Sequence, residues 1–177
     1  MNKEWSELNK TMQAQIKKKD TYKMGIDTLL NLRSQLMQTL VSFKAELCRE
    51  DFNAIPFINA DGYHSKTIAY SIWHIFRIED IVAHTVINED EQVFFAGNYQ
   101  ERINSPIITT GNELIKQQIA DFSKQLNLEE LYSYIFEVRE STEKMLERLS
   151  YDELKRKIPE ERKGYLESLN VVNDNEK

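Results

Sequence analysis

Apolar side chains recur at three- and four-residue spacing along most of this chain, and that spacing restricts its fold more than any other feature. Such spacing places apolar residues on one face of an α-helix. Two long stretches show it best, with Ile26, Leu29, Leu36, Leu40, Phe43 and Leu47 in the first and Leu128, Leu131, Ile135, Val138, Met145 and Leu149 in the second. Turn residues are scarce, since the 177 residues include only five Gly and three Pro. The sequence therefore predicts an all-α fold.

The helical segments predict one domain over residues 1–177. We expect an amphipathic helix in residues 1–19, a bundle over residues 20–170 and a frayed tail over residues 171–177. The core helices are predicted to begin at Tyr22, at Ser65 or Thr67, and at Leu128.

Shorter elements are predicted from local signals. Thr110-Gly111-Asn112-Glu113 and Ser150-Tyr151-Asp152-Glu153 have the spacing of capping boxes and should each open a helix, while Pro159 should open the last one. Residues 51–62 and 92–110 are predicted to be connections, the second with a short helical turn near Val93-Phe94-Phe95.

Charge and cysteine content exclude several classes of protein. The net charge of −6 leaves no basic surface to neutralise phosphates, so we expect no nucleic-acid partner. Cys48 is the only cysteine, which excludes an intramolecular disulfide. The first residues lack the apolar run of a signal peptide, and no stretch has the roughly 20 apolar residues of a membrane span. We expect a cytoplasmic protein without a membrane partner.

Two of the three histidines lie in the helix predicted after Ser65. On an α-helical projection His74 falls on the flank of a broad apolar arc, so it should be at least half buried, either as a satisfied boundary residue or as a ligand. His84 projects to the more exposed side and is expected to be solvated, and His64 is expected in a surface loop. One straight helix does not bring His74 and His84 to the same ion.

Glu79 and Cys48 are the other side chains that invite a functional interpretation. Glu79 projects into the apolar arc, where a carboxylate needs a partner, either Arg33 in a buried ion pair or a ligand in a functional site. Cys48 is predicted at the C-terminal end of a helix, whose dipole disfavours a reactive thiolate.

The run from Thr67 to Ile81, with Trp73-His74 and Arg77-Ile78-Glu79-Asp80, resembles the second helix of the DinB-like (DinB/YfiT-like) family of metalloenzymes. Val138-Arg139-Glu140-Ser141-Thr142, followed by Leu146 and Leu149, resembles the third helix of that family. The resemblance implies a four-helix bundle whose divalent metal is held by one histidine on the second helix and a His-x-x-x-His pair on the fourth.

His74 matches the first of these ligands, and no histidine follows His84. The chain reaches Lys177 about where the fourth helix of the family would begin. We therefore expect an extra N-terminal helix, an incomplete or missing fourth core helix, and a metal site in which His74 is the single matched ligand.

Two functions follow from these observations. The resemblance implies a bacterial, metal-dependent enzyme scaffold of the thiol-transferase or hydrolase type, acting on a small molecule that the sequence does not identify. A lone histidine is expected to bind Zn²⁺ or Ni²⁺ only weakly. The alternative is a non-catalytic helical protein that acts through association with a second copy or a partner helix. Three apolar stripes without a fourth leave a groove, which the N-terminal helix, the segment Tyr165 to Val172 or a second copy of the chain would cover. We expect a homodimer.

Overall fold

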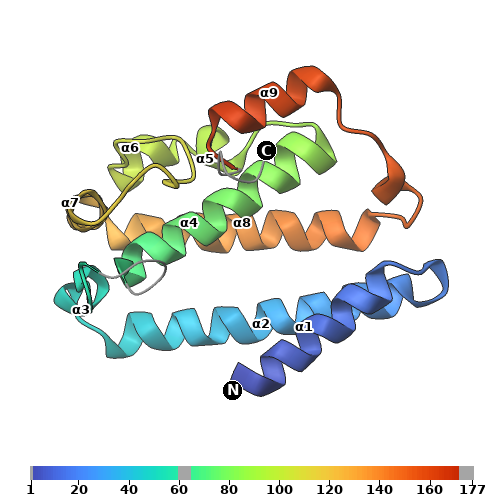
Figure 1. Ribbon diagram of the computed structural model, residues 1–177, viewed down its shortest axis with the longest axis horizontal. Coiled ribbons are helices and arrows are strands. Elements are labelled where there is room, and N and C mark those ends of the chain that lie inside the picture. The colour runs from blue at the N-terminus through green and yellow to red at the C-terminus, as the bar shows by residue number, and fades with distance from the viewer. Residues whose placement is uncertain (1, 60–64, 172–177) are drawn as a thin grey trace. The chain divides into compact units, whose positions relative to one another are not determined.

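The computed structural model describes residues 2–59 and 65–171 (Figure 1). Its regular elements are all helical over those ranges, which confirms the all-α prediction. The chain divides into two compact units, Met1–Leu47 with Glu143–Lys157, and Cys48–Thr142 with Ile158–Lys177. The prediction of a DinB-like four-helix bundle stays a prediction, as does the prediction of a single domain.

The first unit is built on two antiparallel helices, α1 (Asn2–Ile16) and α2 (Tyr22–Glu46), joined by the 3₁₀ turn η1 (Lys19–Thr21) (Figure 1). Gly25 lets the two helices approach, because a Cβ there would lie 2.7 Å from Ile16 Cγ1. Trp5 Nε1 donates to Gln35 Oε1 at 2.6 Å near the other end of the pair. The start predicted at Tyr22 is confirmed, and α1 lies within the stretch 1–19 in which an amphipathic helix was predicted.

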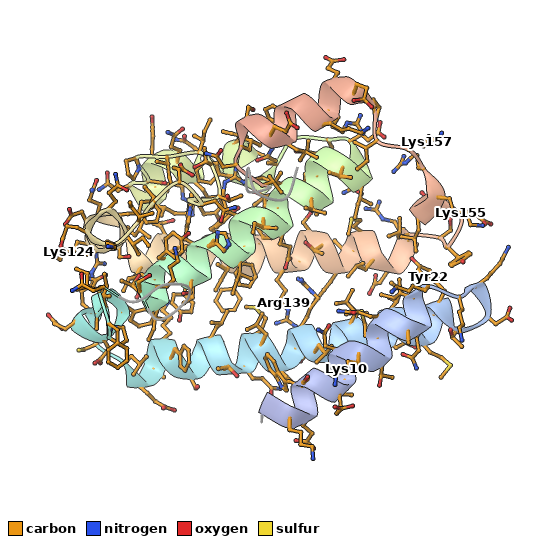
Figure 2. All side chains as sticks on the ribbon, in the orientation of Figure 1. Lys10, Tyr22, Lys124, Arg139, Lys155 and Lys157 are labelled. Atoms are coloured by element: carbon orange, nitrogen blue, oxygen red, sulfur yellow. The ribbon has the colours of Figure 1, made fainter. Side chains whose placement is uncertain are left out.

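The end of α8 (Leu128–Arg148) and the turn η4 (Glu153–Lys155) complete this unit. The Tyr22 hydroxyl, labelled in Figure 2, donates to the Leu149 carbonyl at 2.9 Å, and its ring packs edge-on against Tyr151. Ser150 N donates to Glu153 Oε2 at 2.8 Å, as the capping-box spacing predicted. The helix that should follow is only the three residues of η4, so its predicted length is wrong.

The second unit is built around α4 and the larger part of α8, which lie side by side (Figure 1). The α-helix α4 spans Ile68–Asp80 and is continued by a π-helix, η3, over Ile81–Asn88. Thr67 is the N-cap, since its hydroxyl accepts from Tyr70 N at 2.9 Å. Large side chains from these and the shorter helices fill the core, namely Trp73, Phe76, Phe94, Tyr99, Ile103, Ile119, Leu126, Leu131 and Tyr134.

Five short helices in the described part of the chain also belong to this unit. They are α3 (Arg49–Asn53), α5 (Val93–Ala96), α6 (Tyr99–Ile103), α7 (Gln117–Gln125) and α9 (Glu160–Ser168). The turn near Val93 and the start after Pro159 are confirmed. The patterns missed α6 and placed α3 in a loop, because helices of five residues are too short to show periodicity.

The capping box predicted at Thr110 is wrong. Gly111 has a left-handed φ of +80° and Lys116 one of +46°, so the backbone turns twice before α7 begins at Gln117. The Thr110 hydroxyl donates to the Asn170 carbonyl at 2.6 Å instead of capping the N-terminus of a helix. Spacing alone did not show that this hydroxyl has a tertiary partner.

Over residues 2–59 and 65–171, none of the helices combines the length and the apolar character that a membrane span requires.

Candidate functional site

His74 lies in the middle of α4 and is partly buried, as predicted. Its Nδ1 lies 2.8 Å from the carbonyl oxygen of Thr110. A carbonyl oxygen only accepts hydrogen bonds, so Nδ1 donates this bond, and in the neutral imidazole Nε2 then keeps its lone pair. The ring stacks on Tyr70 one helical turn earlier, with 5.5 Å between centroids and 11° between planes. The imidazole is therefore fixed in both orientation and tautomer.

Tyr70 is held as firmly as the histidine that it supports. Its hydroxyl donates to the Gly111 carbonyl at 2.9 Å, and Lys66 Nζ lies 4.7 Å from the centroid of its ring. Burial, helped by the charge of Glu113, raises the pKa of Tyr70 to about 12, so the phenol stays neutral. Burial lowers the pKa of Lys66.

The loop at Thr110 connects α4 to the C-terminal end of α9. Thr110 is fully buried, and its N–H donates to the Leu169 carbonyl at 3.1 Å. Asn112 Nδ2 donates at 2.7 Å to the Asn170 carbonyl, the same oxygen that accepts from the Thr110 hydroxyl. Asn170 Nδ2 returns a bond of 3.0 Å to Glu113 Oε2. The carbonyl that holds His74 thus belongs to a segment bonded from both sides.

A buried charged network begins at Asp80, at the end of α4. This carboxylate is fully buried and accepts from Val93 N at 2.9 Å, Phe94 N at 3.0 Å and the Tyr134 hydroxyl at 2.8 Å. Arg77 Nη1 donates to it at 3.3 Å. Burial raises the pKa of Asp80, while the charge of Arg77 and the other three donors oppose the rise.

Arg77 balances that carboxylate and joins it to two further segments. Its side chain is fully buried, and Nη2 donates at 2.8 Å both to Gln92 Oε1 and to the Ile108 carbonyl. The guanidinium carbon lies 4.3 Å from the centroid of the Phe94 ring, a cation–π arrangement. The pair is part of what positions α4 against the loop before Thr110.

His84 is buried, with 5% of its surface exposed, so the prediction that it is solvated is wrong. The projection assumed α-helical geometry throughout, whereas the chain becomes a π-helix at Ile81. The i→i+5 bonds of a π-helix place more residues in each turn and rotate every later side chain relative to α4. His84 therefore faces the interior, where Nδ1 lies 2.5 Å from Asp90 Oδ1 and Nε2 lies 2.9 Å from Ser141 Oγ.

Asp90, His84 and Ser141 have the connectivity of a serine hydrolase triad, but two observations favour a structural role. Ser141 lies inside α8, where backbone N–H groups are bonded within the helix and do not offer an oxyanion site. Asp80 Oδ1 lies 3.9 Å from Nε2, so a second carboxylate faces the nitrogen that would act as the base. We interpret this chain of hydrogen bonds as a link that ties η3 to α8.

Two adjoining clefts of about 300 and 330 Å³ share Thr85, Arg162 and Tyr165 in their walls. Arg162 Nη1 forms an ion pair with Glu89 Oε1 at 2.8 Å, and Gln92 Nε2 donates to Thr85 Oγ1 at 2.9 Å. These polar groups of the walls are bonded to one another, which favours a packing role for the clefts between η3 and α9.

Cys48 is exposed and directly precedes α3, so it is also the N-cap of a helix that the sequence did not predict. The backbone N–H of Asp51 lowers the pKa of the Cys48 thiol, but the carboxylates of Asp51 and Glu50 together raise that pKa by more. The net pKa of Cys48 is therefore raised. That direction agrees with the predicted lack of a reactive thiolate.

The sequence-predicted site residues are only partly brought together. His74 and His84 have different hydrogen-bond partners, and the prediction that they do not bind the same ion stays a prediction. Glu79 Oε1 is buried, and the pairing of Glu79 with Arg33, which belongs to the other unit, stays a prediction. His64 lies outside the described residues. Over residues 2–59 and 65–171, no three His, Cys, Asp or Glu side chains converge on one point.

The sequence did not point to Thr110, which contacts His74 from 36 residues further along the chain. It also did not point to Asp80 and Arg77, which help to hold α4 against the loop before Thr110. Arg77 and Asp80 did carry a signal, since they are charged residues three apart in an apolar helix.

Neither a protein-family model nor a curated protein sequence matches this chain.

Proposed function

We propose that the chain is a DinB-like, metal-dependent enzyme scaffold in which Nε2 of His74 is one ligand of a divalent ion, Zn²⁺ or Ni²⁺. The observation that supports this is the hydrogen bond from His74 Nδ1 to the Thr110 carbonyl. Histidines that bind metals commonly donate their other N–H to a carbonyl or carboxylate, which fixes the tautomer and orients the lone pair. His74 has this arrangement, whereas both ring nitrogens of His84 have protein partners.

The remaining ligands are proposed to come from histidines outside residues 1–177 or from a second copy of the chain. Asn170 supports the first source, because its carbonyl is bonded to Thr110 and Asn112, beside the loop that holds His74. When bound by a full ligand set, such a metal lowers the pKa of a thiol or water and makes it a nucleophile.

Metal titration of three versions of the chain tests the proposal. We expect the chain as given to bind Zn²⁺ or Ni²⁺ weakly and to lose it on dialysis against a mild chelator, because one imidazole leaves most protein positions of the ion empty. In NMR spectra, added Ni²⁺ should broaden signals around His74 in the unmodified chain and in the control His64→Ala.

His74→Ala should remove that broadening while leaving the fold intact, because the side chain is only partly buried. Broadening that is the same in His74→Ala as in the unmodified chain would assign the weak site to other residues. Stoichiometric metal after dialysis, measured by elemental analysis, would show that the chain already supplies a complete site.

An association function is the second candidate, favoured by a groove of about 420 Å³ within the first unit. Its apolar walls are Trp5, Met12, Leu29, Leu32 and Leu36. Covering a groove of this kind is favourable at about 25 cal/mol per Å² of apolar surface. We propose that a second copy of the chain covers it.

Sedimentation at micromolar concentration should then give twice the 20.9 kDa mass of the chain. Leu32→Glu places a charge in the groove and should shift the equilibrium toward monomer. Exposed Val41→Glu, on the same helix and outside the groove walls, is the matched control and should not. A monomer in the unmodified chain that binds no hydrophobic dye would contradict the dimer.

A further inference from the structure

Thr110 uses three different groups to join its own loop to two other segments of the second unit, α4 and the end of α9. Its N–H donates to Leu169, its hydroxyl donates to Asn170, and its carbonyl accepts from His74 at 2.8 Å. The residue is fully buried, so none of these groups has water as an alternative partner. The direction of its carbonyl is therefore set by the two bonds that run to the end of α9.

The neighbouring residues reinforce this arrangement. Gly111 accepts from the Tyr70 hydroxyl at 2.9 Å, and a Cβ at its φ of +80° would lie 3.0 Å from the Tyr70 ring. Asn112 donates to the same Asn170 oxygen as Thr110 does. The loop therefore holds the His74 imidazole through its carbonyl and through the ring of Tyr70, on which His74 stacks.

We infer that Thr110 is a positioning residue for His74, which uses its bonds to Leu169 and Asn170 to keep the imidazole in the Nδ1–H tautomer with Nε2 available to a ligand. The part of this inference that concerns metal binding by Nε2 rests on the proposed function. The part of the inference that concerns the tautomer is independent of the proposed function, because the metal-free protein should already show that tautomer. The end of α9 thereby orients His74, the proposed metal ligand, through Thr110.

The tautomer is measured directly by ¹⁵N NMR of the imidazole nitrogens in the metal-free protein at about pH 8.5, where an ordinary imidazole is neutral. The unmodified chain should show the Nδ1–H form at His74. Thr110→Val removes the hydroxyl donor at nearly constant volume and leaves the Asn170 carbonyl with one donor fewer. We expect the Nε2–H population to rise about fivefold, the effect of losing one buried hydrogen bond.

Thr110→Ser keeps the hydroxyl and should restore the tautomer of the unmodified chain, which a loss of packing would not do. Asn112→Ala removes the second donor to Asn170 from a half-buried position and should shift the tautomer in the same direction if Thr110→Val fails to fold. Zn²⁺ affinity at His74 should fall by a similar factor in Thr110→Val and in Asn112→Ala, and it should stay unchanged in Thr110→Ser.

A folded Thr110→Val protein with the tautomer of the unmodified chain would overturn the inference, as would an unchanged tautomer in Asn112→Ala if only that variant folds. If the tautomer shifts as expected but Zn²⁺ perturbs no signal of His74 in the unmodified chain, the proposed function fails and the positioning role of Thr110 stands.

Discussion

Replacing Asp80 with alanine is expected to lower the free energy of unfolding by about 3–5 kcal/mol, because it leaves the charge of Arg77 buried without its counter-ion. Arg77 and Asp80 are both fully buried, so water does not replace the lost partner. The change also removes the acceptor of Val93 N, Phe94 N and the Tyr134 hydroxyl. Urea unfolding followed by circular dichroism measures the loss.

Two further variants show whether the charge or the volume is responsible. Arg77→Met with Asp80→Asn removes both charges at similar volume, keeps an acceptor oxygen at position 80, and should recover much of the loss, since replacing a buried ion pair costs less than breaking it. Asp121 carries an exposed carboxylate on α7, and Asp121→Ala should change the free energy by less than about 0.5 kcal/mol. A loss below about 1 kcal/mol in Asp80→Ala would show that the network is not a stabilising element.

Trp73→Ala is the second large expected effect, a loss of about 3–5 kcal/mol from the cavity left in the core. Trp73 is fully buried, and its ring centroid lies 5.4 Å from that of Phe94 and 5.6 Å from that of Phe122, both edge-on. Its Nε1 is buried and has no hydrogen-bond partner among the described residues. Trp73→Phe should therefore lose much less than the alanine variant, because it keeps a ring and removes an unpaired donor.

Urea unfolding followed by circular dichroism measures the loss in both Trp73 variants, and tryptophan fluorescence reports the first unit separately. The chain has two tryptophans, Trp5 in the first unit and Trp73 in the second. Both Trp73 variants lack the tryptophan of the second unit, so their emission comes from Trp5 and reports the first unit alone. Equal losses in Trp73→Phe and Trp73→Ala would contradict the expected cost of the unpaired donor.

The long helices could be predicted from the sequence because each carries its signal many times. In α2 and α8 the apolar positions recur over 25 and 21 residues, and each repeat marks the same buried face. The burial of His74 followed from the same projection. The projection failed at His84, because nothing in the run after Ile81 signals a change of helix type.

The supporting residues of the candidate site could not be predicted in the same way. Thr110 holds His74 through a backbone carbonyl, a group that every residue has, so the side-chain pattern carries no sign of it. Asp80 was visible as a charge in an apolar helix, but its donors at Val93, Phe94 and Tyr134 are 13 to 54 residues away. Pairings of this kind depend on tertiary structure.

The π-helix of η3 also affects how this chain should be aligned with others. A turn closed by i→i+5 bonds holds one residue more than a turn closed by i→i+4 bonds. A relative with α-helical geometry over the same stretch would therefore reach the position of His84 one residue earlier. A gap of one residue near Ile81 would then mark a change of helix type, with the interior link between the histidine and α8 retained.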